Sequence, residues 1–475
     1  ISAGTAGPTD DAMTEPIYFD AEDRSNAIRA TVAQTEPKAL RTFTPSQAVL
    51  AKSAGCFHWT PEGRRLYDYS SGVLVANLGH NPRRWFQRFC GYMGWSPGDL
   101  TSGGDGYFDA VTLTAYNAVT PVETQAVERL LASLQASNLG RKLDNVCWAA
   151  SGSEAVQKAL WACLNRDPQR DVILATRYGF HGKKGLSNAV TGSEKDPDRD
   201  PRVKFISFPM EEIDDVGRYG EPLDLTTYRN ELEALKKEYG NRLCCLITEP
   251  YLGGGGSFHP PREYHQLLER FCRENDVLFL FDEVQANFGR TGKMYAFEKY
   301  GIAPDFVTLG KGLGNGVPVA AVAGRSDVMS LLKYGAASDT WSAAPLACAS
   351  VIATLDEFEQ NGVLAHAESI GEQILAGLIR LKETGLVVKV RGEGMVFGIE
   401  CGPAGGRTAE QVANAFVEAC YRGKPGGDGI HLLGPLSGKV IRISPPLTMT
   451  ETETRDSLEL MYELVALLAA RLRSE

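Results

Sequence analysis

One acid and one amine, each at the end of an apolar run, are the clearest chemical feature of this 475-residue chain. The run Val277–Phe281 ends in Asp282, and the run Phe306–Leu309 is followed by Lys311, which lies among glycines. Such runs predict buried strands, and parallel sheets bind ligands at the carboxyl ends of their strands. A lysine held partly out of water has a lowered pKa and is a nucleophile toward an aldehyde.

These two side chains suit opposite ends of one cofactor. Lys311 can form a Schiff base with an aldehyde, whereas Asp282 is costly at the end of a buried strand unless it meets a cation, such as a protonated ring nitrogen. Pyridoxal 5'-phosphate carries both groups on one ring. A surface lysine on a flexible turn is the alternative interpretation of a short GKG sequence. The preceding strand and the acid on another strand favour the cofactor.

The surrounding segment resembles the signature of class III aminotransferases, a fold-type-I family dependent on pyridoxal phosphate that includes 4-aminobutyrate, ornithine and omega-amino-acid transaminases. The matching motifs are DEVQ at 282–285, GRTG at 289–292 and Pro304-Asp305 ahead of Lys311, with further matches from about Tyr67 to Thr450. The resemblance implies transfer of an amino group from an amino acid or amine to a keto acid, 2-oxoglutarate or pyruvate. Lys311 would hold the cofactor as an internal aldimine.

The resemblance also assigns the phosphate contacts. Ser151-Gly152-Ser153 follows a predicted strand and opens a helix, whose first amides can bind an anion. By itself this sequence is only a good helix cap, but the family holds the cofactor phosphate with the SGSEA motif, which implies Gly152 and Ser153. Thr340 matches the family threonine that reaches the phosphate from the neighbouring subunit, which implies a homodimer or a tetramer.

The resemblance also assigns contacts to the cofactor ring. Phe180 and His181 match an aromatic–His–Gly motif beside the ring, although an aromatic residue in this position is more often part of a core. Val284 would cover the other face of the ring, and Gln285 would bond to its hydroxyl side. Glu249 resembles the acid of the family's EP motif, which helps to orient the site.

Arg442, just before PPL, resembles the arginine that binds a substrate carboxylate, for which a guanidinium fork is well suited. Relatives that act on ω-amines often carry a glutamate that pairs with this arginine, and Gly254 stands in its place here. A racemase, epimerase or aminomutase of the same fold therefore stays open as the alternative. A nucleotide-binding loop is disfavoured, because GKGLGNG lacks the G-x-x-x-x-G-K-[ST] order.

Composition excludes several classes of protein. The net charge of -10 argues against nucleic acid as a partner, and no apolar run reaches the length that spans a bilayer. The ten cysteines lack metal-ligand spacing, which favours reduced thiols and a cytoplasmic location. The seven histidines are scattered, so no metal site is expected. Residues 1–12 are interpreted as a tail or a vector remnant, ahead of a native start at Met13.

Strands and helices alternate from about residue 145 to 324, which predicts an α/β fold with a mostly parallel, seven-stranded sheet. A smaller α+β domain is expected from both chain ends, with residues 13–82 and 346–475 flanking a large cofactor-binding domain at 83–345. The aromatic and glycine-rich residues 83–115 are interpreted as a loop, either packed on the surface or near the active site or subunit interface. The expected strands of the sheet are Val146–Ala149, Val172–Ala175, Val203–Ser207, Leu243–Ile247, Val277–Phe281, Phe306–Leu309 and Val319–Ala323.

Overall fold

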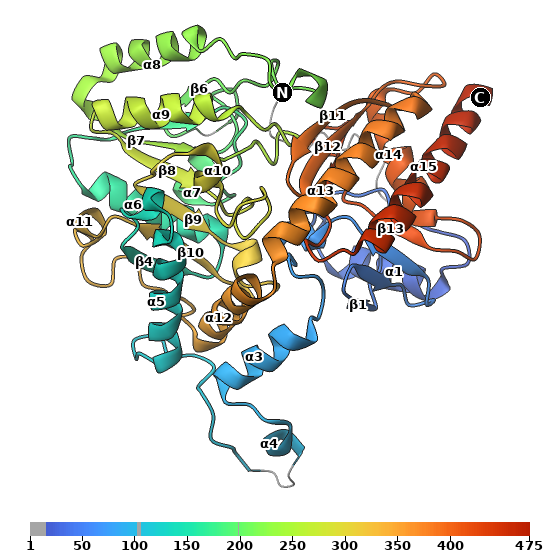
Figure 1. The fold of residues 1–475 in the computed structure, drawn as a ribbon, viewed down its shortest axis with the longest axis horizontal. Coiled ribbons are helices and arrows are strands. Elements are labelled where there is room, and N and C mark those ends of the chain that lie inside the picture. Colours follow the sequence, from blue (N-terminus) through green and yellow to red (C-terminus); the bar gives the residue numbers. More distant parts are fainter. Residues whose placement is uncertain (1–15, 102–105, 198) are drawn as a thin grey trace.

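The computed structural model describes residues 16–101, 106–197 and 199–475 (Figure 1). The predicted tail at residues 1–12, and the start at Met13, lie outside these residues. None of the helices in these ranges combines the length and the apolar composition of a transmembrane segment.

A seven-stranded sheet forms the centre of the larger half of the molecule, in the order β4-β10-β9-β8-β7-β5-β6 (Figure 1). Neighbouring strands from β9 to β6 pair in parallel, while β10 is antiparallel to both β9 and β4. Each strand overlaps a strand that the sequence predicts, so the mostly parallel sheet is confirmed. The strands are β4 (Asn145–Ala149), β5 (Val172–Thr176), β6 (Val203–Ile206), β7 (Leu243–Thr248), β8 (Leu278–Asp282), β9 (Phe306–Leu309) and β10 (Ala320–Gly324).

Both faces of this sheet are buried. Along β8, Phe279 and Phe281 pack into one apolar cluster, while Leu278 and Leu280 pack into another, as the two-residue period of a strand requires. Strands buried on both faces are largely apolar, which explains the near-continuous apolar runs in the sequence. The helices of this half are α5 (Pro121–Gln135), α6 (Gly152–Asn165), α7 (Gly185–Ala189), α8 (Thr226–Tyr239), α9 (Arg262–Glu274), α10 (Ala296–Tyr300) and α11 (Ser326–Met329).

The smaller half joins the two ends of the described chain (Figure 1). Strand β3 (Arg65–Asp68) pairs in parallel with β13 (Gly429–His431), in a sheet of order β1-β2-β3-β13. An α+β domain built from both chain ends is thereby confirmed, while its exact boundaries stay a prediction. Its other elements are α1 (Asp23–Thr35), β1 (Lys52–Ala54), β2 (Phe57–Trp59), α2 (Ser71–Leu74), α13 (Val363–Arg380), β11 (Val387–Glu393), β12 (Val396–Cys401), α14 (Ala409–Arg422), β14 (Val440–Ile443) and α15 (Glu451–Ser474).

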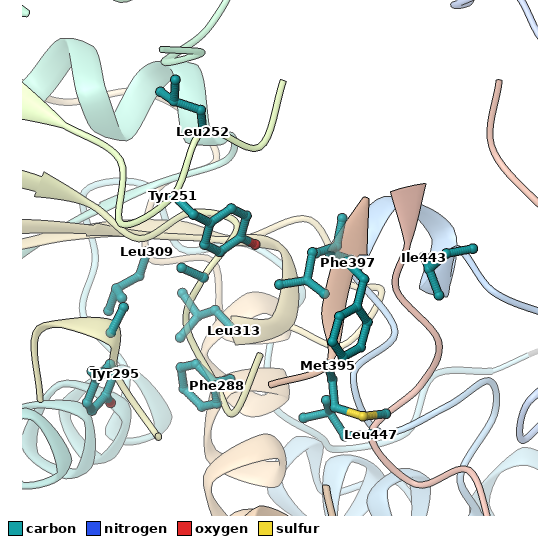
Figure 2. Packing of buried hydrophobic residues seen from close by; sticks show 14 of the residues in the cluster. Tyr251, Leu252, Phe288, Tyr295, Leu309, Leu313, Met395, Phe397, Ile443 and Leu447 are labelled. Carbon is teal, nitrogen blue, oxygen red and sulfur yellow. The ribbon is translucent and has the colours of Figure 1, made fainter. Parts of the chain in front are cut away.

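Apolar packing connects the two halves. Figure 2 shows Tyr251 and Leu313, which follow strands of the large sheet, in one cluster with Phe397 of β12 and Ile443 of β14. A continuous buried cluster of this kind restricts the movement of the small domain relative to the sheet. Residues from both halves can therefore hold fixed positions around one site.

The segment that begins at residue 83 differs from its prediction as a loop, because its first part is the helix α3 (Arg83–Met93). Trp85, Phe89 and Met93 are buried at every fourth position, and Trp85 Nε1 donates to Thr354 Oγ1 at 2.9 Å on α12 (Pro345–Gln360). The four-residue spacing is the helical signal that the aromatic composition obscured. After α3 the chain projects from the body of the molecule and includes α4 (Pro97–Thr101) (Figure 1).

Candidate active site

The carboxyl ends of neighbouring strands surround a cavity of about 380 Å³. Asp282 is the last residue of β8, Glu249 follows β7, and Lys311 lies two residues beyond β9. Because these three strands are adjacent in the sheet, residues distant in the sequence meet at one edge. Nine of the eleven predicted site residues line the cavity, namely Gly152, Ser153, Phe180, His181, Glu249, Asp282, Val284, Gln285 and Lys311.

Three groups fix the Asp282 carboxylate. Asp282 and Thr308 are register partners on β8 and β9, and Thr308 Oγ1 donates to Asp282 Oδ1 at 2.7 Å. The Val284 amide donates to the same oxygen at 3.1 Å, while His181 Nδ1 lies 2.7 Å from Oδ2. The carboxylate is thus held in one orientation at the wall of the cavity.

Lys311 presents an amine without a fixed partner. Among the described residues, its Nζ forms no hydrogen bond or ion pair. Burial and, to a lesser extent, the positive charge of Arg442 lower the pKa of Lys311 to about 8, while the charges of Asp282 and Glu249 act in the opposite direction. Its backbone φ of 49° lies in the left-handed region, where a non-glycine residue is strained, and such strain occurs most often at functional sites.

The start of α6 lines the same cavity. Ser151 Oγ caps the helix by accepting from the Glu154 amide at 3.3 Å. A Cβ added at Gly152 would lie 2.8 Å from Val284 Cγ1, so a larger residue would not fit there without movement of Val284. The amides at a helix start, together with the Ser153 hydroxyl, make a site for an anion.

Glu249 connects two loops of the cavity. Its carboxylate accepts from the Phe180 amide at 2.7 Å and from the Gly253 amide at 3.2 Å. Burial raises the pKa of Glu249 to about 7. The Phe180 ring, 41% exposed, stands at the cavity, and Gln285 Oε1 is a buried acceptor that has no hydrogen-bond partner among the described residues.

The remaining two predicted residues lie outside the lining of this cavity. Arg442, on β14, is buried, and its Nη2 donates to the Gly253 carbonyl oxygen at 2.6 Å. Its Nε is buried without a hydrogen-bond partner in the described chain. Thr340 is exposed, beside Asp339, whose carboxylate binds Lys158 Nζ at 2.7 Å.

Two positioning residues were missed by the sequence interpretation. Thr308 supports Asp282, and Asn287 Nδ2 donates to the Gly310 carbonyl at 3.1 Å, just before Lys311. The signal for Thr308 was its hydroxyl within an otherwise apolar strand. Asn287 carried no such signal, because it follows the DEVQ motif in a loop.

These groups fit pyridoxal phosphate. A free amine suits its aldehyde, a fixed carboxylate suits its ring nitrogen, and a helix start suits its phosphate. Gln285 Oε1 is a buried acceptor without a hydrogen-bond partner in the described chain, and the hydroxyl of the cofactor ring would donate to it. A flat aromatic ring, Phe180, is present for stacking.

Comparison with known proteins shows the family. Residues 105–465 match the family described as Aminotransferase class-III. An acetylornithine aminotransferase of Caldanaerobacter subterraneus subsp. tengcongensis is 28% identical over 90% of this chain and 96% of its own length. An omega-aminotransferase of Caulobacter vibrioides is also 28% identical, over 90% and 94% respectively.

Solved structures share the fold. The crystal structure of ornithine aminotransferase from Toxoplasma gondii superposes with a TM-score of 0.76 at 22% identity, covering 94% of this chain and 96% of that one. No comparison favours the racemase, epimerase or aminomutase alternative. Since the family match spans most of the chain, this protein belongs to the class III aminotransferases and is an enzyme that transfers amino groups with pyridoxal phosphate.

Proposed function

We propose that Lys311 binds the cofactor covalently and moves the proton during amino transfer, with Asp282 opposite the ring nitrogen. Bound pyridoxal phosphate supplies an aldehyde and a ring that accepts electron density. The observation that carries this assignment is the pairing of an unpartnered amine and a fixed carboxylate at one cavity. Of the lining residues, Lys311 offers the one amine side chain.

The lowered pKa of Lys311 suits proton transfer in both directions. With a pKa of about 8, roughly a tenth of the side chain is a free amine at pH 7, and about half is at pH 8. The free amine would take a proton from the amine-bearing carbon of the substrate, and the resulting ammonium would deliver that proton to the carbon of the former cofactor aldehyde. Asn287 supports this by holding the Gly310 carbonyl, which fixes the backbone from which the lysine extends.

Arg442 is our candidate for binding the carboxylate of the keto acid, 2-oxoglutarate or pyruvate. It forms no ion pair within the described residues, and the Gly253 carbonyl that it contacts is a neutral acceptor. A substrate carboxylate would supply the charge that the buried guanidinium lacks. Because Gly254 has no side chain, no carboxylate of the enzyme at this position would compete for Arg442. The amino donor would be an amino acid or another amine.

We further propose a homodimer in which Thr340 reaches the phosphate of the neighbouring subunit. In a single chain Thr340 is exposed, and so are Trp341 and Tyr334 on the same segment, at 64% and 107%. Exposed aromatic residues of this kind are typical of interfaces. For location we propose the cytoplasm, where a reducing environment would keep the ten free cysteines as thiols.

Amino transfer by purified variants tests the proposed function. Amine donors are supplied with 2-oxoglutarate or pyruvate, and the aminated product is measured for the wild type, Lys311→Ala and the exposed-lysine control Lys236→Ala. We expect wild-type and control activity only when a keto acid is present, and loss of turnover in Lys311→Ala. Turnover of a chiral amino acid without any keto acid would instead support the racemase alternative, and an active Lys311→Ala would refute the role of the lysine.

A further inference from the structure

Three of the seven histidines surround one buried aspartate in the small domain. His431 and Asp68 are register partners on the parallel strands β13 and β3. His58 on β2 is the partner of Leu66, which is two residues before Asp68 and therefore on the same face of the sheet. His80 Nε2 lies 2.7 Å from Asp68 Oδ2. Strand pairing thus unites residues that appear scattered in the sequence.

One pair of atoms in this cluster has the spacing of two ligands on one metal ion, and a third lies nearby. One ligand atom from each of His58, Asp68 and His431 lies within 4.8 Å of the others. His58 Nε2 and Asp68 Oδ2 are 3.5 Å apart. Two ligands bound tetrahedrally to one zinc ion, at about 2.0 to 2.1 Å each, stand about 3.4 Å from one another. The His58–Asp68 pair is therefore close to this ligand spacing, and His431 lies within reach of the same point.

The hydrogen bonding of the histidines is incomplete. His58 Nε2 and His431 Nδ1 are buried without a hydrogen-bond partner in the described chain. His58 is only 2% exposed, and the 3.5 Å to Asp68 is too long for a good N–H···O bond. His58 Nδ1 lies 2.7 Å from Ser53 Oγ, so the ring is held with Nε2 directed at the carboxylate. A cation between them would satisfy groups that are costly to leave unpaired.

Hydrogen bonds from residues outside the proposed ligand set hold the Asp68 carboxylate in place. Asp68 Oδ1 accepts from the Ser70 amide at 2.7 Å, from Ser70 Oγ at 2.6 Å and from the Ser71 amide at 3.1 Å. His80 contacts the other oxygen. Such outer partners orient the ligands of metal sites and strengthen metal binding.

We propose that His58, Asp68 and His431 bind a divalent transition metal ion, best matched by Zn²⁺, and that His80 positions the carboxylate. Two imidazoles and one carboxylate are ligands that Zn²⁺ accepts, and a water molecule would complete the tetrahedron. None of these residues lines the active-site cavity. The ion would connect β2 and β3 to β13, joining the N-terminal and C-terminal parts of the small domain.

Metal binding by the full-length protein tests this site. After dialysis against a chelator, the protein is titrated with Zn²⁺, its metal content is measured, and Co²⁺ is used as a visible probe. We expect one Zn²⁺ per chain, and Co²⁺ bands typical of tetrahedral nitrogen and oxygen ligands without a sulfur charge-transfer band. Zn²⁺ should also raise the thermal unfolding midpoint, because only the folded chain presents the site.

Variants locate the ion. His58→Gln and His431→Gln should lose stoichiometric binding, while His80→Gln should weaken it by about 10- to 100-fold. Two controls should bind as the wild type does: His366→Gln, away from the cluster, and Lys311→Ala, which separates this site from the proposed active site. Uptake well below one ion per wild-type chain, equal uptake by His58→Gln and His431→Gln, or a sulfur charge-transfer band would overturn the proposal. If either variant does not fold, the Co²⁺ spectrum of the wild type tests the site instead. Bands of tetrahedral nitrogen and oxygen ligands would support the proposal, and their absence would contradict it.

Discussion

His181 Nδ1 lies 2.7 Å from Asp282 Oδ2, which links the loop after β5 to the last residue of β8. The second oxygen of the carboxylate is occupied by Thr308 and by the Val284 amide. Three groups of the chain therefore orient the Asp282 carboxylate. Such support is expected where a carboxylate must meet a charged atom in a fixed direction.

Asp282→Asn should reduce turnover on the order of 10²- to 10⁴-fold, because a neutral amide cannot stabilise a protonated ring nitrogen. The shape of the side chain is nearly unchanged, so the unfolding midpoint should change little. Steady-state rates with one donor and one keto acid measure the effect, and Asp144→Asn, a surface carboxylate that binds Ser326 Oγ at 2.9 Å, is the control. Equal activity of Asp282→Asn and the wild type would exclude the proposed role.

The rate of covalent cofactor attachment should rise with pH and level off above about pH 8. Only the free amine of Lys311 attacks the aldehyde, and burial sets the pKa of this amine near 8. Since Arg442 contributes to lowering that pKa, Arg442→Gln should shift the profile to higher pH. Stopped-flow absorbance after mixing apoprotein with the cofactor gives the profile. A profile that is flat across this range, or unchanged by Arg442→Gln, would disagree with this electrostatic account.

Glu283→Gln should flatten the pH dependence of stability. Glu283 accepts from the Ala296 and Phe297 amides at 2.6 and 2.7 Å, and burial raises its pKa from an ordinary 4.5 to about 8. Between these values the folded protein retains a proton that the unfolded chain has lost, so this group makes stability fall as pH rises. The fall attributable to Glu283 is on the order of a few kcal/mol at most.

Urea unfolding of the wild type, Glu283→Gln and the exposed control Glu372→Gln at about pH 5.5 and 8 measures this difference. The control should follow the wild type, whereas Glu283→Gln should lose less stability between the two pH values. Parallel behaviour of all three proteins would show that Glu283 is ionised across the range.

Gly254→Glu should raise KM for the keto acid more than Gly254→Ala does. Gly254 adjoins Gly253, whose carbonyl binds Arg442, so a glutamate here would bring a competing carboxylate near the guanidinium. A Cβ at this position would lie 3.3 Å from Phe180 Cβ, so Gly254→Ala reports the steric effect separately. The measurement is the KM for 2-oxoglutarate of the wild type, Gly254→Ala and Gly254→Glu. Equal KM values for the two variants would contradict the proposal that Arg442 binds the carboxylate of the keto acid.

The sequence predicted the sheet and most of the cavity because both depend on local patterns. Apolar runs marked the strands, and the ends of those strands placed Asp282 and Lys311. The cluster around Asp68 was not predictable, since it depends on the pairing of β3 with β13 across most of the chain. Helix α3 was missed because its aromatic and glycine-rich composition suggested a loop, although the spacing of Trp85, Phe89 and Met93 is helical.

The contact made by Arg442 is another feature that could not be predicted from the sequence. Its family motif predicted a substrate contact, but the sequence contained no indication that its guanidinium would bind the Gly253 carbonyl. That contact depends on how the glycine-rich loop after β7 approaches β14 of the small domain. Such an approach is a tertiary feature, and local patterns carry no information about it.

Reductive trapping tests the central role of Lys311 most directly. The protein is incubated with pyridoxal phosphate, reduced with borohydride, digested and analysed by mass spectrometry to find the lysine that carries the cofactor. We predict modification at Lys311 in the wild type and its loss in Lys311→Ala. A cofactor attached mainly to another residue, such as Lys158 or Lys183, would contradict the assignment of this site.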